Sequence, residues 1–88
     1  MPPFRLPIDY DVVLFIEGLP WPARRLLRAR IGEIRDHPLH RSDYAESDAI
    51  GRRVEINICG GFALKFWIDH ADRQIKILDI HPADRRRG

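Results

Sequence analysis

The spacing of hydrophobic residues along the chain changes once, near its middle. Before residue 37, apolar positions recur every three or four residues, which is the spacing of one face of a helix. From residue 53 onward they alternate with polar positions, which is typical of strands with one buried face. The pattern therefore predicts helices in the first half and a β-sheet in the second.

Two helices are predicted, and only Pro20 and Trp21 separate them. Asp9 suits the N-cap of the first helix, which Pro20 ends. Pro22 suits the first turn of the second helix, which must stop before Pro38 because the residue preceding a proline is pushed out of the helical region. So short a connection predicts a tight helical hairpin. The apolar positions are Val12, Phe15, Ile16 and Leu19 in the first helix, and Ala23, Leu26, Leu27, Ile31 and Ile34 in the second.

Two further segments have weaker patterns. Residues 4–8 alternate, but Pro7 interrupts them and cannot donate to a ladder, so they predict an edge strand at most. Residues 40–51 are polar and have no clear period. They predict a connection that has room for a short strand near Tyr44.

Three strands are predicted in the second half, and the first two are joined by Cys-Gly-Gly at residues 59–61. The predicted strands are residues 53–58, 62–68 and 75–80. A two-residue loop would pair Asn57 with Leu64 and mix polar and apolar side chains on one face of the sheet. A three-residue loop pairs Ile58 with Phe62 and keeps that face wholly apolar, so we expect the three-residue loop.

The expected register decides which side chains share the polar face of the sheet. It places Glu55 opposite Lys65. It also places Arg53 opposite Trp67, with Asn57 on the same face. The last strand is apolar in both phases, so we expect it to be central and covered on both faces. The predicted fold class is α+β, with an N-terminal edge strand and a helical hairpin packed on a three- to four-stranded antiparallel sheet.

Composition and charge fit a single domain over residues 1–88. Hydrophobic residues make up 44% of the chain, and the net charge is +2. The one cysteine allows no internal disulfide and excludes a cysteine-based zinc site. The chain has no apolar stretch of the length that a signal peptide or a membrane span needs, so we expect a cytoplasmic protein without a membrane partner. Arginines crowd residues 24–35 and 85–87, which suits nucleic acid or an acidic protein, or simply solvated helix faces.

The polar face offers candidate chemistry on a phosphate. Glu55 is a candidate general base, and Lys65 is a candidate phosphate contact. Arg53 and Trp67 are candidates for holding a nucleic-acid backbone and stacking a base. An ordinary cross-strand ion pair beside a cation–π contact is the structural alternative.

A second candidate lies at the end of the last strand. Asp79 and His81 are two residues apart and therefore project to the same face. A carboxylate beside an imidazole orients a general acid or base, and a solvated strand end is the alternative. His37 and His40 would have the spacing of metal ligands only on a continuous helix, which Pro38 prevents, so we expect no metal.

Most of the chain resembles the RelE/ParE toxin superfamily of type II toxin–antitoxin systems. The stretch GRRVEINICGGFALKFWIDHADRQIKILDIHPADRRR is similar to its pattern of a basic strand, a Gly-aromatic turn, a strand ending in an acidic turn and a final strand leading to His or Arg. The stretch FRLPIDYDVVLFIEGLPWPARRLLRARIGEIRDHP is similar to its N-terminal half. Asp79 and His81 resemble the Asp-Tyr-His ending of the HigB branch, with Ile80 in the middle position.

The resemblance implies a RelE-like fold and the toxin of a type II pair, acting as an mRNA endonuclease on the ribosome. It implies an antitoxin encoded by the adjacent gene as partner, and no metal or cofactor. Ala63 stands where RelE-like nucleases carry arginine, so the alternatives are a gyrase-inhibiting toxin and a non-catalytic binding protein of this fold. The implied catalytic residues are Glu55, Lys65, His81 and Arg85, and the implied RNA-binding residues are Arg53, Asn57, Trp67, Asp79 and Arg86.

Overall fold

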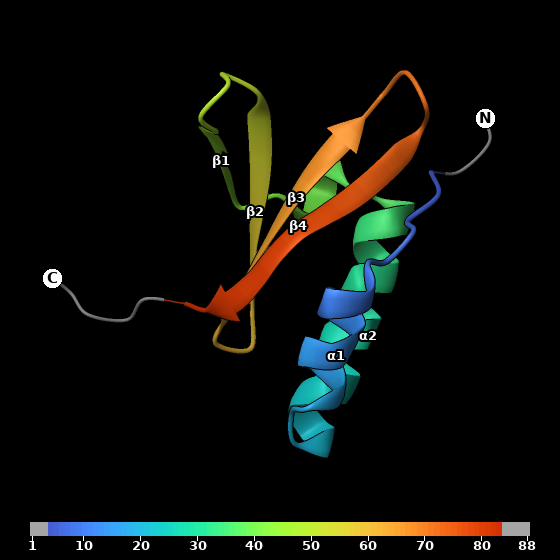
Figure 1. Cartoon of the computed structure of the whole chain (residues 1–88), viewed down its shortest axis with the longest axis vertical. Helices are drawn as coiled ribbons and strands as arrows, with labels where there is room; N and C mark the ends of the chain where they lie inside the picture. The colour runs from blue at the N-terminus through green and yellow to red at the C-terminus, as the bar shows by residue number, and fades with distance from the viewer. Residues whose placement is uncertain (1–3, 84–88) are drawn as a thin grey trace, which may run out of the picture.

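The computed structural model describes residues 4–83, and its elements follow the predicted order (Figure 1). The helices are α1 (Tyr10–Glu17), α2 (Trp21–Asp36) and the short 3-10 helix η1 (Leu39–Arg41), and the strands are β1 (Tyr44–Ser47), β2 (Arg53–Cys59), β3 (Phe62–Asp69) and β4 (Gln74–Pro82). The strands form one antiparallel sheet in the order β1-β2-β3-β4. The α+β class and the short strand at Tyr44 are therefore confirmed.

The helical hairpin forms as the proline positions predict. Asp9 occupies the N-cap of α1, where its backbone carbonyl accepts the N–H of Val12 and of Val13 at 3.1 Å, but its side chain makes no capping hydrogen bond. Pro22 lies in the first turn of α2, and the helix ends before Pro38. Figure 1 shows the two helices running antiparallel beside one another, on one side of the sheet. Within residues 4–83, neither helix is long and apolar enough to cross a membrane.

The main core lies between the two helices and one face of the sheet. Its buried residues are Val12, Ile16, Leu27, Ile31 and Ile34 from the helices, and Cys59, Leu64, Phe66, Ile68, Ile75, Ile77 and Ile80 from the strands. A second, small cluster of Val54, Ile56 and Ala63 lies on the opposite face. Both faces of β2 and β3 are therefore partly buried, although the helices cover only one of them.

The N-terminal segment makes less of a strand than the sequence allows. It forms a single parallel bridge between Arg5 and Gln74. The N–H of Arg5 donates to the carbonyl of Arg73 at 3.0 Å, and the N–H of Ile75 donates to the carbonyl of Arg5 at 2.8 Å. Pro7 follows and has no N–H to continue the ladder, so the pairing stops there.

The expected register of β2 and β3 is wrong. The structure pairs Asn57 with Leu64, so the loop has two residues, Gly60 and Gly61. Both glycines have positive φ, 58° and 85°, as a type I′ hairpin turn requires. This register turns Asn57, a polar residue of β2, toward the core, which the hydrophobic pattern disfavours. The fold accepts it because polar partners for that residue are supplied by other parts of the chain.

This register separates side chains that were expected to share one face. Glu55 lies opposite Phe66 and not opposite Lys65. Arg53 pairs with Ser47 of β1 and is not opposite Trp67. Because side chains alternate along a strand, Arg53, Glu55 and Asn57 belong to the side of the sheet that the helices cover, and Lys65 and Trp67 belong to the other side.

The expectation that the last strand is central is also wrong, because β4 is an edge strand. Ile77 of β4 pairs with Phe66 of β3, and Asp79 pairs with Lys65, the residue that precedes Phe66. Leu78 is therefore one extra residue, which forms a β-bulge between these two pairs. The bulge explains why apolar residues fall in both phases of this strand.

The bulge decides which side chains of β4 face the helices. It brings Ile80 onto the same side as Ile75 and Ile77, and all three are buried in the main core. It thereby turns Asp79 and His81 to the other side, where they pair with Lys65 and Ala63. We call the side of the sheet turned away from the helices the open face. Its residues are Tyr44, Glu46, Val54, Ile56, Ile58, Ala63, Lys65, Trp67, Lys76, Asp79 and His81.

We expect Gly60 to tolerate substitution less well than Gly61. Alanine at either position must adopt positive φ, which costs about 1 kcal/mol. A Cβ on Gly60 would also overlap the side chain of Leu26, whereas a Cβ on Gly61 meets nothing within 4 Å. Gly61→Ala should therefore lower the free energy of unfolding by about 1 kcal/mol in urea denaturation, and Gly60→Ala by slightly more, because the partly exposed Leu26 side chain must move aside.

A Leu26→Ala background separates strain from overlap. In that background the two alanine variants should cost the same, because the overlapping side chain is gone. Equal costs in the wild-type background would contradict the close approach of Leu26 to the turn.

Candidate functional site

Lys65 lies at the centre of the open face. It pairs with Ile56 of β2 on one side and with Asp79 of β4 on the other. Its Nζ forms an ion pair with Oε1 of Glu46 on β1, at 3.1 Å. The ammonium is therefore held by the carboxylate that lies across β2, and one-third of the lysine side chain remains exposed.

Asp79 and His81 form a hydrogen-bonded pair on the same face. Oδ2 of Asp79 and Nδ1 of His81 are 2.7 Å apart, and both side chains are about half exposed. In the neutral tautomer that donates from Nδ1 to this carboxylate, Nε2 is the acceptor nitrogen of the ring. The imidazole is thus oriented to accept a proton at Nε2.

Trp67 has two basic neighbours. Cζ of Arg52 lies 4.6 Å from the centre of its indole ring, and Nζ of Lys76 lies 5.9 Å from it. Both distances are within the range of cation–π contacts. Such a contact was expected from Arg53, and Arg52 makes it instead. Two cations therefore lie next to this indole, and Lys65 follows on the same face of β3, two residues from Trp67.

Glu55 lies on the helix side and is almost fully buried, at 3% exposure. Its Oε1 accepts the hydroxyl of Ser42 at 2.5 Å, and its Oε2 accepts Nε of Arg53 at 2.7 Å. Burial acts to raise the pKa of Glu55, but these hydrogen bonds and the charge of Arg53 hold the pKa below its ordinary value of 4.5. The same contact raises the pKa of Arg53. Glu55 is therefore engaged within the protein and does not reach the open face.

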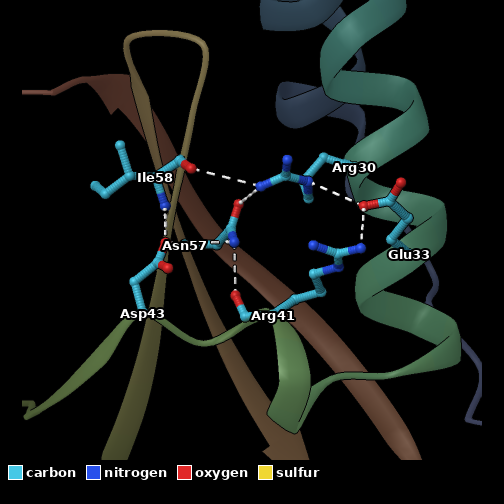
Figure 2. A network of polar contacts seen from close by, with 6 residues as sticks. All are labelled: Arg30, Glu33, Arg41, Asp43, Asn57 and Ile58. Carbon is cyan, nitrogen blue, oxygen red and sulfur yellow. Dashed lines mark hydrogen bonds and ion pairs between the residues drawn. The ribbon is translucent and has the colours of Figure 1, made fainter.

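Asn57 is also buried on the helix side, where it connects β2 to α2 and η1 (Figure 2). Its Oδ1 accepts Nη1 of Arg30 at 3.0 Å, and its Nδ2 donates to the carbonyl of Arg41 at 2.6 Å. Arg30 and Arg41 both bind Oε1 of Glu33 at 3.1 Å. Four side chains from three elements thus satisfy one another around a single buried amide.

Asp43 completes this network at the start of β1 (Figure 2). Its Oδ2 accepts the backbone N–H of Ile58 at 2.7 Å and lies 3.5 Å from Nδ2 of Asn57. These contacts fix the chain between η1 and β1 against β2. Because Glu46 follows on β1, the network also helps to hold Glu46 in reach of Lys65.

The structure divides the site residues predicted from sequence into three groups. Lys65, Trp67, Asp79 and His81 come together on the open face, while Arg53, Glu55 and Asn57 lie on the helix side and bind other residues of the chain. Arg85 and Arg86 lie outside the described residues. Glu46, Arg52 and Lys76 also belong to this surface and were not predicted from the sequence. Turn residues Asp48 and Gly51 are the signal that would have placed a hairpin before β2.

Two histidines near η1 stack on each other. The ring centres of His37 and His40 are 5.9 Å apart, with an angle of 24° between the ring planes. Within residues 4–83, no three His, Cys, Asp or Glu side chains are grouped in a way that suits a metal ion. The described residues therefore provide no candidate metal centre.

Comparison with known proteins identifies no relative of this chain. No protein-family model matches the chain, and neither a curated protein nor a solved structure matches it. The resemblance to the RelE/ParE superfamily stays a prediction. The function must therefore be argued from the open face itself.

Glu55→Gln should make the stability of the protein less sensitive to acid. The folded state holds the pKa of Glu55 below 4.5, so this carboxylate adds stability above pH 4.5 that is lost as the pH falls through the folded-state value. Glutamine does not titrate, and the variant should lose this part of the pH dependence. At neutral pH it should be about 1 kcal/mol less stable, because a charge-assisted hydrogen bond to Arg53 is weakened.

Urea denaturation at a series of pH values measures both effects. The matched control is Glu17→Gln, because Glu17 forms an exposed ion pair with Arg28 at 3.0 Å and exposed pairs contribute little. Wild-type acid sensitivity in Glu55→Gln would show that the buried pair does not contribute as described.

Proposed function

We propose that this protein is the toxin of a type II toxin–antitoxin pair and that it cleaves mRNA on the ribosome with side chains of the open face. The observation that supports the proposal most is that the register places Lys65 and the hydrogen-bonded Asp79–His81 pair on the same face, with Lys65 and Asp79 as cross-strand partners. RNA cleavage by the 2′-hydroxyl needs a proton acceptor and a cation for the phosphate. These residues provide both, in side chains that remain partly exposed.

In the proposed reaction, Nε2 of His81 takes the proton from a 2′-hydroxyl of the RNA. The 2′ oxygen attacks the adjacent phosphorus, the bond from phosphorus to the 5′ oxygen breaks, and the 5′ oxygen takes up a proton from water. The products are a 2′,3′-cyclic phosphate and a 5′-hydroxyl, and His81 returns its proton to solvent. Lys65 stabilises the charge that develops on the phosphate oxygens.

The geometry favours His81 over Glu55 as the proton acceptor. Glu55 is buried on the helix side, and both of its carboxylate oxygens already accept hydrogen bonds. Ala63, the position at which RelE-like nucleases carry arginine, lies directly opposite His81 on the open face. Lys65 follows two residues later on that same face, and a phosphate that drew its ammonium away from Glu46 would have a cation in place of the missing arginine.

We propose the antitoxin from the adjacent gene as the partner of the helical side. A hollow of about 190 Å³ there is lined by Ile8, Val13, Ile16, Glu17, Arg28 and Ile31. Arg28 of α2 lines this hollow, and the same helix carries further arginines, which favours an acidic partner. An acidic amphipathic helix matches both the apolar lining and the charge.

Induced expression in bacteria tests the proposal. Growth should stop, mRNA should be cleaved, and co-expression of the adjacent gene should restore growth. Combining Lys65→Ala with His81→Ala should reduce cleavage at least about a hundredfold, because the proton acceptor and the phosphate cation are both lost. The fold should be intact by circular dichroism, since both side chains lie outside the main core.

The matched control combines Arg24→Ala with Arg28→Ala on α2 and should leave the arrest unchanged. Growth arrest with DNA damage and intact mRNA would favour a gyrase-inhibiting toxin. Normal growth would favour a non-catalytic binding protein. If the Arg24→Ala and Arg28→Ala double variant no longer arrests growth while the Lys65→Ala and His81→Ala double variant still does, the active surface lies on the helices.

Glu46→Gln should strengthen RNA binding. The carboxylate of Glu46 competes with an RNA phosphate for the ammonium of Lys65, at 3.1 Å. Because partly exposed ion pairs contribute little, the dissociation constant of a non-cleavable 2′-O-methyl RNA should fall by roughly threefold. In a Lys65→Met background, the fall in the dissociation constant caused by Glu46→Gln should be no larger than the fall caused by Glu17→Gln. Glu17→Gln is the control, because it removes the same charge from the helical side. An undiminished effect in that background would exclude competition at Lys65.

A further inference from the structure

Trp67 is an aromatic residue that neither the main core nor the proposed cleavage uses. Phe66, its neighbour on β3, is completely buried between the sheet and the helices. Trp67 points the other way, to the open face, where it is only partly buried. A large aromatic side chain in this position contributes less to the core than its size allows, and exposed apolar side chains of this kind often belong to binding surfaces.

Arg52 is fixed in place beside the indole. Its Nε donates to Oδ2 of Asp48 at 2.9 Å, and its backbone N–H donates to Oδ1 of the same carboxylate at 2.9 Å. Burial acts to raise the pKa of Asp48, but its hydrogen bonds from Arg52 and Ile50 hold the pKa below its ordinary value. The loop between β1 and β2 therefore presents the guanidinium next to Trp67 with little freedom to move away.

The Arg52–Trp67 pair lies at a distance from Lys65 that an RNA strand can span. Lys65 and Trp67 lie on the same face of one strand, about 7 Å apart along it. Lys76, the cross-strand partner of Trp67, adds a further positive charge beside the indole. An RNA strand with one phosphate on Lys65 would bring a neighbouring base to the Arg52–Trp67 pair.

We infer that Arg52 and Trp67 form a nucleobase-binding subsite that selects single-stranded RNA. Guanidinium and indole planes both stack on bases, and such stacking tolerates every base because each has a π-face. A base inside a duplex is stacked on its neighbours and is not available to an aromatic side chain. The inference rests on the proposed function for its ligand, RNA, but it does not depend on cleavage.

Tryptophan fluorescence tests the subsite, because the chain has only two tryptophans. Trp21→Phe leaves Trp67 as the single reporter, and Trp67→Phe leaves Trp21, which is exposed on α2, as the matched control. The probe is a single-stranded 2′-O-methyl oligoadenosine, which binds without being cleaved. It should quench Trp67 in the Trp21→Phe protein and leave Trp21 unquenched in the Trp67→Phe protein.

Two further probes separate base from phosphate and single strand from duplex. An abasic oligonucleotide of equal charge and a duplex of the same sequence should both leave Trp67 unquenched. Arg52→Gln and Trp67→Ala should each weaken binding of the single strand by about tenfold. Equal quenching by the abasic probe or by the duplex would overturn the inference, as would no quenching of Trp67 by the single strand.

The outcome for the subsite is distinguishable from the outcome for the nuclease. Quenching of Trp67 by the single strand, in a protein that cleaves no mRNA, would support the subsite and contradict the proposed nuclease activity. Cleavage of mRNA without any quenching of Trp67 would keep the enzyme and overturn the subsite.

Discussion

The two positive φ angles at Gly60 and Gly61 are the constraint on which the arrangement of this sheet depends. Because side chains alternate along a strand, a loop with one more residue would turn β2 over relative to β3. Glu55 would then face Lys65 on one surface. With the observed turn, Glu55 faces the helices instead, and a different carboxylate, Glu46 of β1, reaches Lys65. The turn therefore determines which charges surround the central lysine of the open face.

The cost of this register is the burial of polar side chains beneath the helices, and the chain offsets that cost with hydrogen bonds. Unpaired polar groups in a core cost free energy, whereas paired ones are close to neutral. Asn57 is paired with Arg30 and with the backbone of η1, and Glu55 is paired with Ser42 and Arg53. These contacts also fasten β1 to the rest of the molecule. The site on one face thus depends on a polar network on the other.

The sequence was sufficient for the fold class, the two helices and the first two long strands, because each has a sustained hydrophobic period, and it located the last strand by its apolar run. It was insufficient for the register, because a polar residue of β2 faces the helices and hydrophobic alternation predicts an apolar one there. The partners that make this possible, Arg30 and Ser42, are distant in sequence, and no local pattern connects either of them to β2. The Gly-Gly pair was nevertheless a local signal for the two-residue turn.

The predicted central position of the last strand was wrong for a different reason. Its apolar residues occupy both phases, which is typical either of a strand covered on both faces or of one with a bulge. Only tertiary packing distinguishes these, and here the extra residue Leu78 keeps Ile80 in the core. The same bulge brings Asp79 and His81 beside Lys65. The candidate site therefore arises at an irregularity that hydrophobic pattern alone did not predict.

The claim that the open face binds RNA is tested most directly by NMR, in a titration with a non-cleavable single-stranded RNA. We expect saturable shifts of the indole N–H of Trp67 and of the imidazole of His81, while the resonance of the indole N–H of Trp21 on α2 stays in place. Shifts of Trp21 and of the arginines of α2, with Trp67 and His81 unmoved, would contradict it.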